Sequence, residues 1–189
     1  MKKAEDIEMR KIIAGLFISL DGVVESPQNW QLPYFNDELG AAVGSLMAAT
    51  DTMLLGRRTY QEFAGFFADQ TGDANADRMN NTPKLVASTT LEKAEWRNST
   101  LIKGNVAEEL ARLKRQPGGN IGMSGSATLV RSLLRDNLLD ELVLLVHPIV
   151  VGTGKRLFED MGEQVMLTLV DSQTFSTGVL SLTYEPAGK

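Results

Sequence analysis

The sequence contains no cysteine, and its single histidine is His147. The missing cysteines exclude disulfide bonds, thiolate metal ligands and a cysteine nucleophile. One histidine is also too few for the multi-histidine sites that hold catalytic zinc or iron, so we expect no metal centre. His147 directly precedes a proline, and a lone histidine in such a place is more often structural than catalytic.

The chain also lacks an excess of basic residues and a long apolar run. Its 19 lysines and arginines stand against 24 aspartates and glutamates, a net charge of −5, which argues against a nucleic-acid or membrane surface. No apolar stretch approaches the roughly 18 residues of a membrane span, and residues 1–11 lack the apolar core of a signal peptide. We expect a polar lead-in at 1–8, a single domain at 9–189, a cytoplasmic location and a small-molecule partner.

Short apolar runs alternate with amphipathic stretches along the chain. Apolar runs predict buried strands at 12–18, 52–55, 84–87, 120–123 and 142–146, and helical spacing predicts helices at 39–47, 59–67, 106–113 and 126–135. Segments 165–170 and 179–184 favour a hairpin, and the polar segment 69–81 is expected to be a loop. This order predicts an α/β fold: a mainly parallel sheet with helices on both faces and an antiparallel C-terminal hairpin.

Ligands of open α/β sheets bind at the carboxyl ends of the parallel strands. The second predicted strand is followed by Gly56-Arg57-Arg58-Thr59. Glycine lets a ligand approach the backbone, arginine offers planar donors suited to phosphate, and Thr59 stands where the next helix begins with partial positive charge. We interpret this turn as a phosphate site, with a solvated arginine pair as the alternative.

Two further turns carry related signals. The run Ser124-Gly125-Ser126-Ala127-Thr128-Leu129 opens a helix with small residues that suit an anion nest, without the spacing of a standard dinucleotide fingerprint or a P-loop. Ser88 and Thr89 follow the third strand, where hydroxyl groups either contact a ribose phosphate or form a turn. Two anion-binding helix starts suit the pyrophosphate and terminal phosphate of a dinucleotide.

These motifs, in this order, resemble the dihydrofolate-reductase-like superfamily: Ser19-Leu20-Asp21-Gly22, then residues 55–60, 125–129 and 148–158. The closest branch looks like the stand-alone relatives of the reductase domain of bifunctional riboflavin-biosynthesis deaminase-reductases. The similarity runs from about Met9 to Tyr184. It implies a three-layer fold around a mainly parallel eight-stranded sheet, NADPH as the cofactor, and a homodimer.

The resemblance also implies roles for particular residues. It places the cofactor against a group at the strand ends: Ala14, Gly56, Arg57, Arg58, Thr59, Ser88, Thr89, Ser124, Gly125, Ser126, Ala127, Thr128 and Leu129. Trp30, Tyr34 and Phe35 are expected to form an apolar wall against a planar heterocycle, ordinary core packing being the alternative. Asp21 is the candidate catalytic residue, on a loop expected to be flexible and to cross the cofactor and substrate; a plain turn is the alternative.

Trp30-Gln31-Leu32-Pro33 resembles a stretch of dihydrofolate reductases, which place an acid two residues after that proline. Phe35 stands there in this chain, and a phenyl ring neither accepts the pterin's donors nor relays a proton. We therefore expect an NADPH-dependent reductase of a small heterocycle, similar to 5-amino-6-(5-phosphoribosylamino)uracil reductase, and not a dihydrofolate reductase. A reductase of another conjugated or pteridine compound, and a non-catalytic nucleotide-binding domain, stay open.

Overall fold

The computed structural model describes residues 9–188, so the lead-in expected at 1–8 lies outside the described residues. The strands are β1 (Ile12–Ser19), β2 (Thr50–Gly56), β3 (Lys84–Ala87), β4 (Ser99–Ile102), β5 (Asn120–Met123), β6 (Glu141–His147), β7 (Leu167–Thr174) and β8 (Leu180–Pro186). The helices are α1 (Asp37–Ala48), α2 (Arg57–Phe67), α3 (Ala74–Asn81), α4 (Val106–Lys114) and α5 (Ala127–Arg135).

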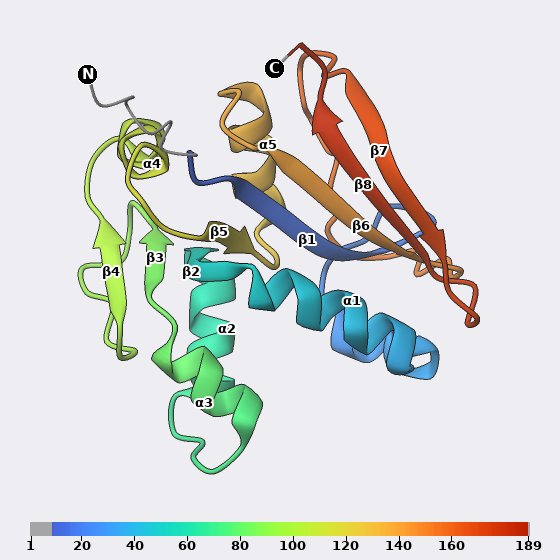
Figure 1. The fold of residues 1–189 in the computed structure, drawn as a ribbon, viewed down its shortest axis with the longest axis horizontal. Coiled ribbons are helices and arrows are strands. Elements are labelled where there is room, and N and C mark those ends of the chain that lie inside the picture. Colours follow the sequence, from blue (N-terminus) through green and yellow to red (C-terminus); the bar gives the residue numbers. More distant parts are fainter. Residues whose placement is uncertain (1–8, 189) are drawn as a thin grey trace, which may run out of the picture.

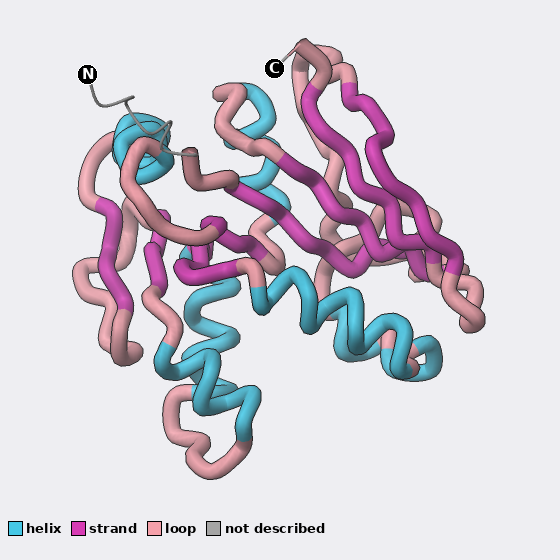
Figure 2. The backbone as a smooth tube through the Cα atoms, viewed as in Figure 1, coloured by secondary structure: helices cyan, strands magenta, loops and turns pink. Residues whose placement is uncertain are grey.

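All eight strands form one sheet in the order β4-β3-β2-β5-β1-β6-β8-β7 (Figure 1). The pairings from β4 through to β6 are parallel, whereas β8 runs antiparallel to both β6 and β7. Residues 136–188 form strands and loops only (Figure 2). The expected mainly parallel eight-stranded sheet with an antiparallel C-terminal hairpin is confirmed.

Helices cover both faces of the sheet because the central strands are apolar on both sides. Along β1, Ile12, Leu16 and Ile18 face the main core, which is completed by side chains of α4 and α5. Phe17 points to the opposite face and packs with α1. This double burial explains the nearly unbroken apolar run of β1. Within residues 9–188, no helix is long and apolar enough to cross a membrane.

The expectation of a loop at 69–81 was wrong, because this segment contains α3. The Asp73 side chain caps the helix by accepting the Ala76 N–H at 2.9 Å. Met79 is buried against the core beneath α2. The buried Lys84 side chain donates to the Met79 carbonyl oxygen at 2.7 Å and thereby satisfies a group at the helix end. The helix is stabilised by its ends and by tertiary contacts rather than by an apolar stripe.

The short strand β5 creates an opening in the middle of the sheet. It pairs with β1 only from Ile12 to Ala14, and with β2 only as far as Met53. Both neighbours continue beyond these pairings, β1 to Ser19 and β2 to Gly56. Past the end of β5, no common strand therefore joins β1 and β2. The opening lies at the carboxyl ends of three parallel strands, where ligands of α/β sheets bind.

Candidate functional site

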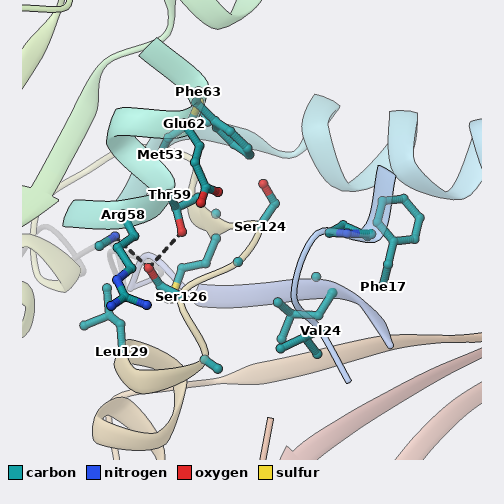
Figure 3. A pocket seen from close by; sticks show the side chains of 18 of the residues that line it. Phe17, Val24, Met53, Arg58, Thr59, Glu62, Phe63, Ser124, Ser126 and Leu129 are labelled. Atoms are coloured by element: carbon teal, nitrogen blue, oxygen red, sulfur yellow. Dashed lines mark hydrogen bonds between the residues drawn. The ribbon is translucent and has the colours of Figure 1, made fainter. Parts of the chain in front are cut away.

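A cavity of about 970 Å³ occupies this opening. It is lined from β1, β2, β3, β5 and β6 and from the helices α1, α2, α3, α4 and α5. Figure 3 shows the first turns of α2 and α5 meeting on one side of the cavity, with Phe17 and Val24 on the other. The volume lies at the upper end of the range of roughly 300–1,000 Å³ that small-molecule sites occupy.

Ser126 joins the two helix starts. Its Oγ accepts the Gly56 N–H at 3.0 Å and lies 3.1 Å from the Thr59 hydroxyl (Figure 3). A Cβ atom at position 56 would lie 2.2 Å from that Oγ, so any side chain there would force Ser126 to shift. Gly125 has a φ of +116°, a backbone conformation that residues with a side chain rarely adopt. It also packs against Thr59. The structure thus brings together the two turns that the sequence indicated separately.

The helix starts at the cavity differ from the other helix starts in their capping. Helices α1, α3 and α4 are capped by the side chains of Asn36, Asp73 and Asn105. Helices α2 and α5 begin after Gly56 and Ser126, without a side-chain cap. The first-turn N–H groups of α2 and α5 therefore keep hydrogen-bonding capacity and partial positive charge where they meet the cavity, as in an anion site.

Three cationic side chains line the cavity near these helix starts. Arg57 and Arg58 are exposed, and Figure 3 shows Arg58 beside Ser126. Lys155 reaches the same place from the loop after β6, where its Nζ donates to the Thr128 hydroxyl at 2.9 Å. Lys155 is not among the residues that the sequence indicated, because its proximity to α5 depends on the tertiary fold.

The remaining predicted cofactor contacts lie in different surroundings. Ser124, Ala127, Thr128 and Leu129 line the cavity. Ala14, Ser88 and Thr89 are not among the described residues that line it. Ala14 is fully buried in the main core.

Ser88 closes the turn after β3 by accepting the Thr90 and Leu91 N–H groups, while Thr89 is exposed. The Ser88 hydroxyl therefore forms the turn that was the alternative for this segment.

The Asp21 carboxylate joins the loop after β1 to the loop after β6 through hydrogen bonds. Its carboxylate accepts the Ser19 hydroxyl at 2.7 Å and the N–H groups of Val151 and Gly152 at 3.0 and 2.8 Å. These hydrogen bonds, led by that from Ser19, lower the pKa of Asp21 to about 2. Asp21 is not among the described cavity-lining residues. The loop expected to be flexible is instead tied to the segment after β6.

The expected aromatic wall also lies elsewhere. Trp30 and Tyr34 meet the buried His147 ring edge to face, with centroids 5.3 and 5.6 Å apart. Phe35 is 52 % exposed. None of the three aromatic residues belongs to the described lining of the cavity. Burial lowers the pKa of His147, and its Nδ1 lies 2.8 Å from the Leu145 carbonyl oxygen, so His147 anchors the aromatic loop to β6.

The opposite end of the cavity is apolar. We call it the apolar arm and define it by Met47 of α1, Met53 of β2, Phe63 and Phe67 of α2, and Met79 of α3. All five side chains pack in the core cluster beneath α2. Sequence reasoning missed this arm, because its residues come from four elements.

Glu62 is exposed and lines the cavity one turn after Arg58 and Thr59 on α2. Thr59 stands three residues before it, a spacing that places the two side chains on the same side of α2, and Phe63 also lines the cavity (Figure 3). Within residues 9–188 the structure gives its carboxylate no hydrogen-bond or ion-pair partner. The spacing from Thr59 was a helical signal that could have indicated this position.

The chain belongs to the RibD C-terminal domain family, whose model matches residues 10–181. Its relatives include YyaP of Bacillus subtilis (strain 168), an uncharacterized protein that is 29% identical over 184 residues, covering 95% of this chain and 96% of YyaP.

Three solved structures share the fold. A protein of Shewanella sp. PV-4 named for riboflavin biosynthesis gives a TM-score of 0.76 at 22% identity, covering 93% of this chain and 98% of that one. The Saccharomyces riboflavin biosynthesis reductase Rib7 gives 0.62 at 16% identity, covering 98% and 93%. Dihydrofolate reductase from Enterococcus faecalis, complexed with NADP(H), gives 0.58 at 17% identity, covering 94% and 96%. The fold is therefore dihydrofolate-reductase-like.

Proposed function

We propose that the protein is an NADPH-dependent reductase of a small planar heterocycle, similar to the riboflavin-pathway reductases. The observation that carries this proposal is the pair of uncapped helix starts, α2 and α5, which face one cavity and are joined through Ser126. Membership of the RibD C-terminal domain family supports a reductase. The NADP(H) complex of the dihydrofolate reductase with the same fold supports the cofactor.

The residues present fit a phosphorylated dinucleotide. We assign the pyrophosphate to the start of α5, where Lys155 adds a positive charge. We assign the terminal phosphate to Arg58, whose guanidinium offers planar donors. Gly56 and Gly125 keep side chains away from the point where the backbone of both turns meets the ligand.

NADPH, when bound, supplies a hydride to the substrate. The chain itself would orient the two partners and exclude water. The helix starts hold the phosphates, while the apolar arm presents Met53 and Phe63 to the face of a planar ring. The tied loop at Asp21 leads into the cavity-lining residues from Val24 onward, and so fixes the wall opposite α2.

Dihydrofolate is not the proposed substrate. Dihydrofolate reductases carry an acid at the position where this chain has Phe35. In the structure the Phe35 side chain is largely exposed, so it does not provide a contact that would replace the acid. We therefore expect substrates that, unlike the pterin ring of dihydrofolate, do not need a carboxylate at this position.

The direct test is a fluorescence titration of NADPH and NADH against the wild type, Arg58→Ala and Arg97→Ala. Arg58→Ala should weaken NADPH by about 1.5–3 kcal/mol, which is the size of a hydrogen bond to a charged group, and should weaken NADH less. Arg97→Ala removes the same charge from an exposed residue that is not in the described lining, and should change neither affinity.

Two outcomes would contradict the assignment. Absence of NADPH binding at millimolar concentration would remove the reductase proposal. Equal losses for both cofactors in Arg58→Ala would place Arg58 away from the terminal phosphate. NADPH binding without oxidation by any heterocycle tested would favour the non-catalytic nucleotide-binding alternative.

A further inference from the structure

We propose that Ser126 is a strained positioning residue that fixes the spacing of the two helix starts at the cavity, so that they bind the two phosphate groups of the cofactor as a unit. The inference rests on the proposed function in one respect, the assignment of the pyrophosphate to the start of α5 and of the terminal phosphate to the start of α2. It adds the residue that couples these two sites and the backbone strain that this coupling requires.

The backbone of Ser126 lies in the left-handed region, with φ and ψ of +62° and +64°. In the part of the chain that the structure describes, five residues other than glycine have a positive φ. Three of them are Asn98, Asn137 and Asp160, whose residue types tolerate this region best. The other two are Ser26 and Ser126, and both line the cavity. The less tolerant residue type is thus found at the candidate site, where backbone strain commonly collects.

In this conformation the Ser126 side chain packs into the other helix start. Its Oγ accepts the Gly56 N–H at 3.0 Å and lies 3.1 Å from the Thr59 hydroxyl (Figure 3). Glycine at position 56 makes room for it, since a Cβ atom there would lie 2.2 Å from the Oγ. In the opposite direction Thr59 packs against Gly125, where a Cβ atom would lie 3.1 Å from the Thr59 Cγ2. Each helix start therefore has a glycine that makes room for a hydroxyl-bearing side chain of the other.

This reciprocal packing fixes the distance between the two helix starts, neither of which has a side-chain cap. A ligand with two phosphate groups gains fully from both starts only when their separation already matches the ligand. Otherwise part of the binding free energy is spent on bringing them together. The Ser126 hydroxyl contributes this preorganisation, whereas the left-handed backbone of the same residue lowers the stability of the fold. A substitution at position 126 can therefore change affinity and stability in opposite directions.

The experiment separates the hydroxyl from the strain by comparing Ser126→Ala with Ser126→Gly. Both variants lose the Oγ, but only glycine relieves the left-handed backbone. Adenosine 2′,5′-bisphosphate carries the terminal phosphate and one phosphate of the pyrophosphate, whereas 5′-AMP lacks the terminal one. Calorimetry gives the ratio of their dissociation constants. We expect the bisphosphate to bind the wild type roughly 10–100-fold more tightly, as one further charged contact provides. In both variants this advantage should fall roughly ten-fold, because the two helix starts are no longer held at a fixed spacing.

Urea denaturation supplies a second readout that separates positioning from stability. Ser126→Gly should unfold at a higher urea concentration than Ser126→Ala, because both lose the same hydrogen bonds and only alanine keeps the strain. The more stable variant should nevertheless show no larger advantage for the bisphosphate. Asn137→Gly is the matched control: it relieves the same backbone conformation at the other end of α5, outside the described lining, and should leave the ratio of dissociation constants unchanged.

Three results would overturn the inference: the wild-type ratio retained in both variants, a ratio that recovers from Ser126→Ala to Ser126→Gly in step with stability, or a Ser126→Gly variant no more stable than Ser126→Ala. A reduced ratio in Asn137→Gly would do the same. If the wild type binds neither nucleotide, or gains nothing from the second phosphate, the cofactor assignment of the proposed function fails instead. The two failures are therefore distinguishable.

Discussion

At the scale of single residues, Gly56 has the most restricted environment in the site. A methyl group there would lie 2.2 Å from the Ser126 Oγ, and the clash would push α2 and α5 apart. The φ of Gly56 is −77°, which alanine tolerates, so the effect is steric rather than conformational. We predict that Gly56→Ala lowers both the free energy of unfolding, by about 1–3 kcal/mol, and the affinity for NADPH. Chemical denaturation and cofactor titration measure the two effects.

Gly65 provides the control for this substitution. It lies in the same helix, and a Cβ atom there would meet nothing within 4 Å. Gly65→Ala should raise the free energy of unfolding by about 0.5–1 kcal/mol, because alanine is favoured over glycine in helix interiors. Equal stabilities of the two variants would show that Ser126 moves away without cost.

Asp21 makes the stability of the protein depend on pH in the acid range. Its pKa in the folded protein is about 2, below the ordinary value of 3.8. The carboxylate therefore stabilises the fold fully above about pH 4, and this contribution is lost as pH falls through 2. We predict that Asp21→Asn lowers the free energy of unfolding at neutral pH, and that the difference from the wild type shrinks between pH 4 and pH 2.

Urea denaturation at each pH measures this difference, with Asp69→Asn as a control at an exposed position. The difference in unfolding free energy between wild type and Asp21→Asn could instead stay constant from pH 6 to pH 2. That result would mean that the hydrogen bonds to Asp21 do not favour its charged form over its protonated form. Cofactor titration of Asp21→Asn adds a separate readout of whether the tied loop supports the cavity.

At the scale of elements, α3 depends on its cap. Asp73 accepts the Ala76 N–H, and Asp73→Ala should cost about 1 kcal/mol of unfolding free energy, whereas Asp73→Asn should cost little because asparagine caps nearly as well. Because α3 carries Met79 into the apolar arm, Asp73→Ala should also weaken substrate more than cofactor. Denaturation and separate titrations of the two ligands measure this, and equal weakening of both would contradict it.

The same helix shows the limits of prediction from the sequence. Strand β5 at Asn120–Met123 was predicted to the residue, since Ile121 and Met123 stand in a short apolar run between turn signals. Helix α3 was not, because its sequence is polar and its inward residues Ala76 and Met79 form no stripe long enough to recognise. Strand β4 was missed as well, since only Leu101 and Ile102 at its end are apolar.

The site shows the same division. The turns at Gly56 and Gly125 were indicated by local chemistry, and the structure brings them together through Ser126. Lys155 and Glu62 were not indicated, because their place at the cavity depends on contacts between distant segments or on which side of α2 faces inward. Local sequence signals predict where a helix begins. They do not predict which side chains from other segments lie beside that helix start.

At the scale of the whole molecule, the edge of the sheet exposes apolar side chains. Leu169 and Val170 of β7, Leu180 of β8 and the adjacent Met166 are each at least 37 % exposed. Proteins rarely leave such a strand edge uncovered, because it invites pairing with another chain. We propose that this face forms the interface of a homodimer.

We predict a dimer in sedimentation analysis at micromolar concentration, and a monomer for the double variant Leu169→Asp, Leu180→Asp. The substitutions place charges in an apolar interface, where their desolvation is costly. Retained cofactor binding would show that the variant is folded. A monomeric wild type, or a double variant that stays dimeric, would exclude this face as the interface.

The two ends of the cavity share α2 but otherwise draw on different stretches of chain. Half of the cofactor cradle lies at Gly125 and Ser126, whereas Met47 and Met79 enter the apolar arm from α1 and α3. A mutation in α1 or α3 can therefore reshape one end without touching the other. If the proposed function holds, related proteins with this arrangement can keep the same cofactor while their substrates diverge.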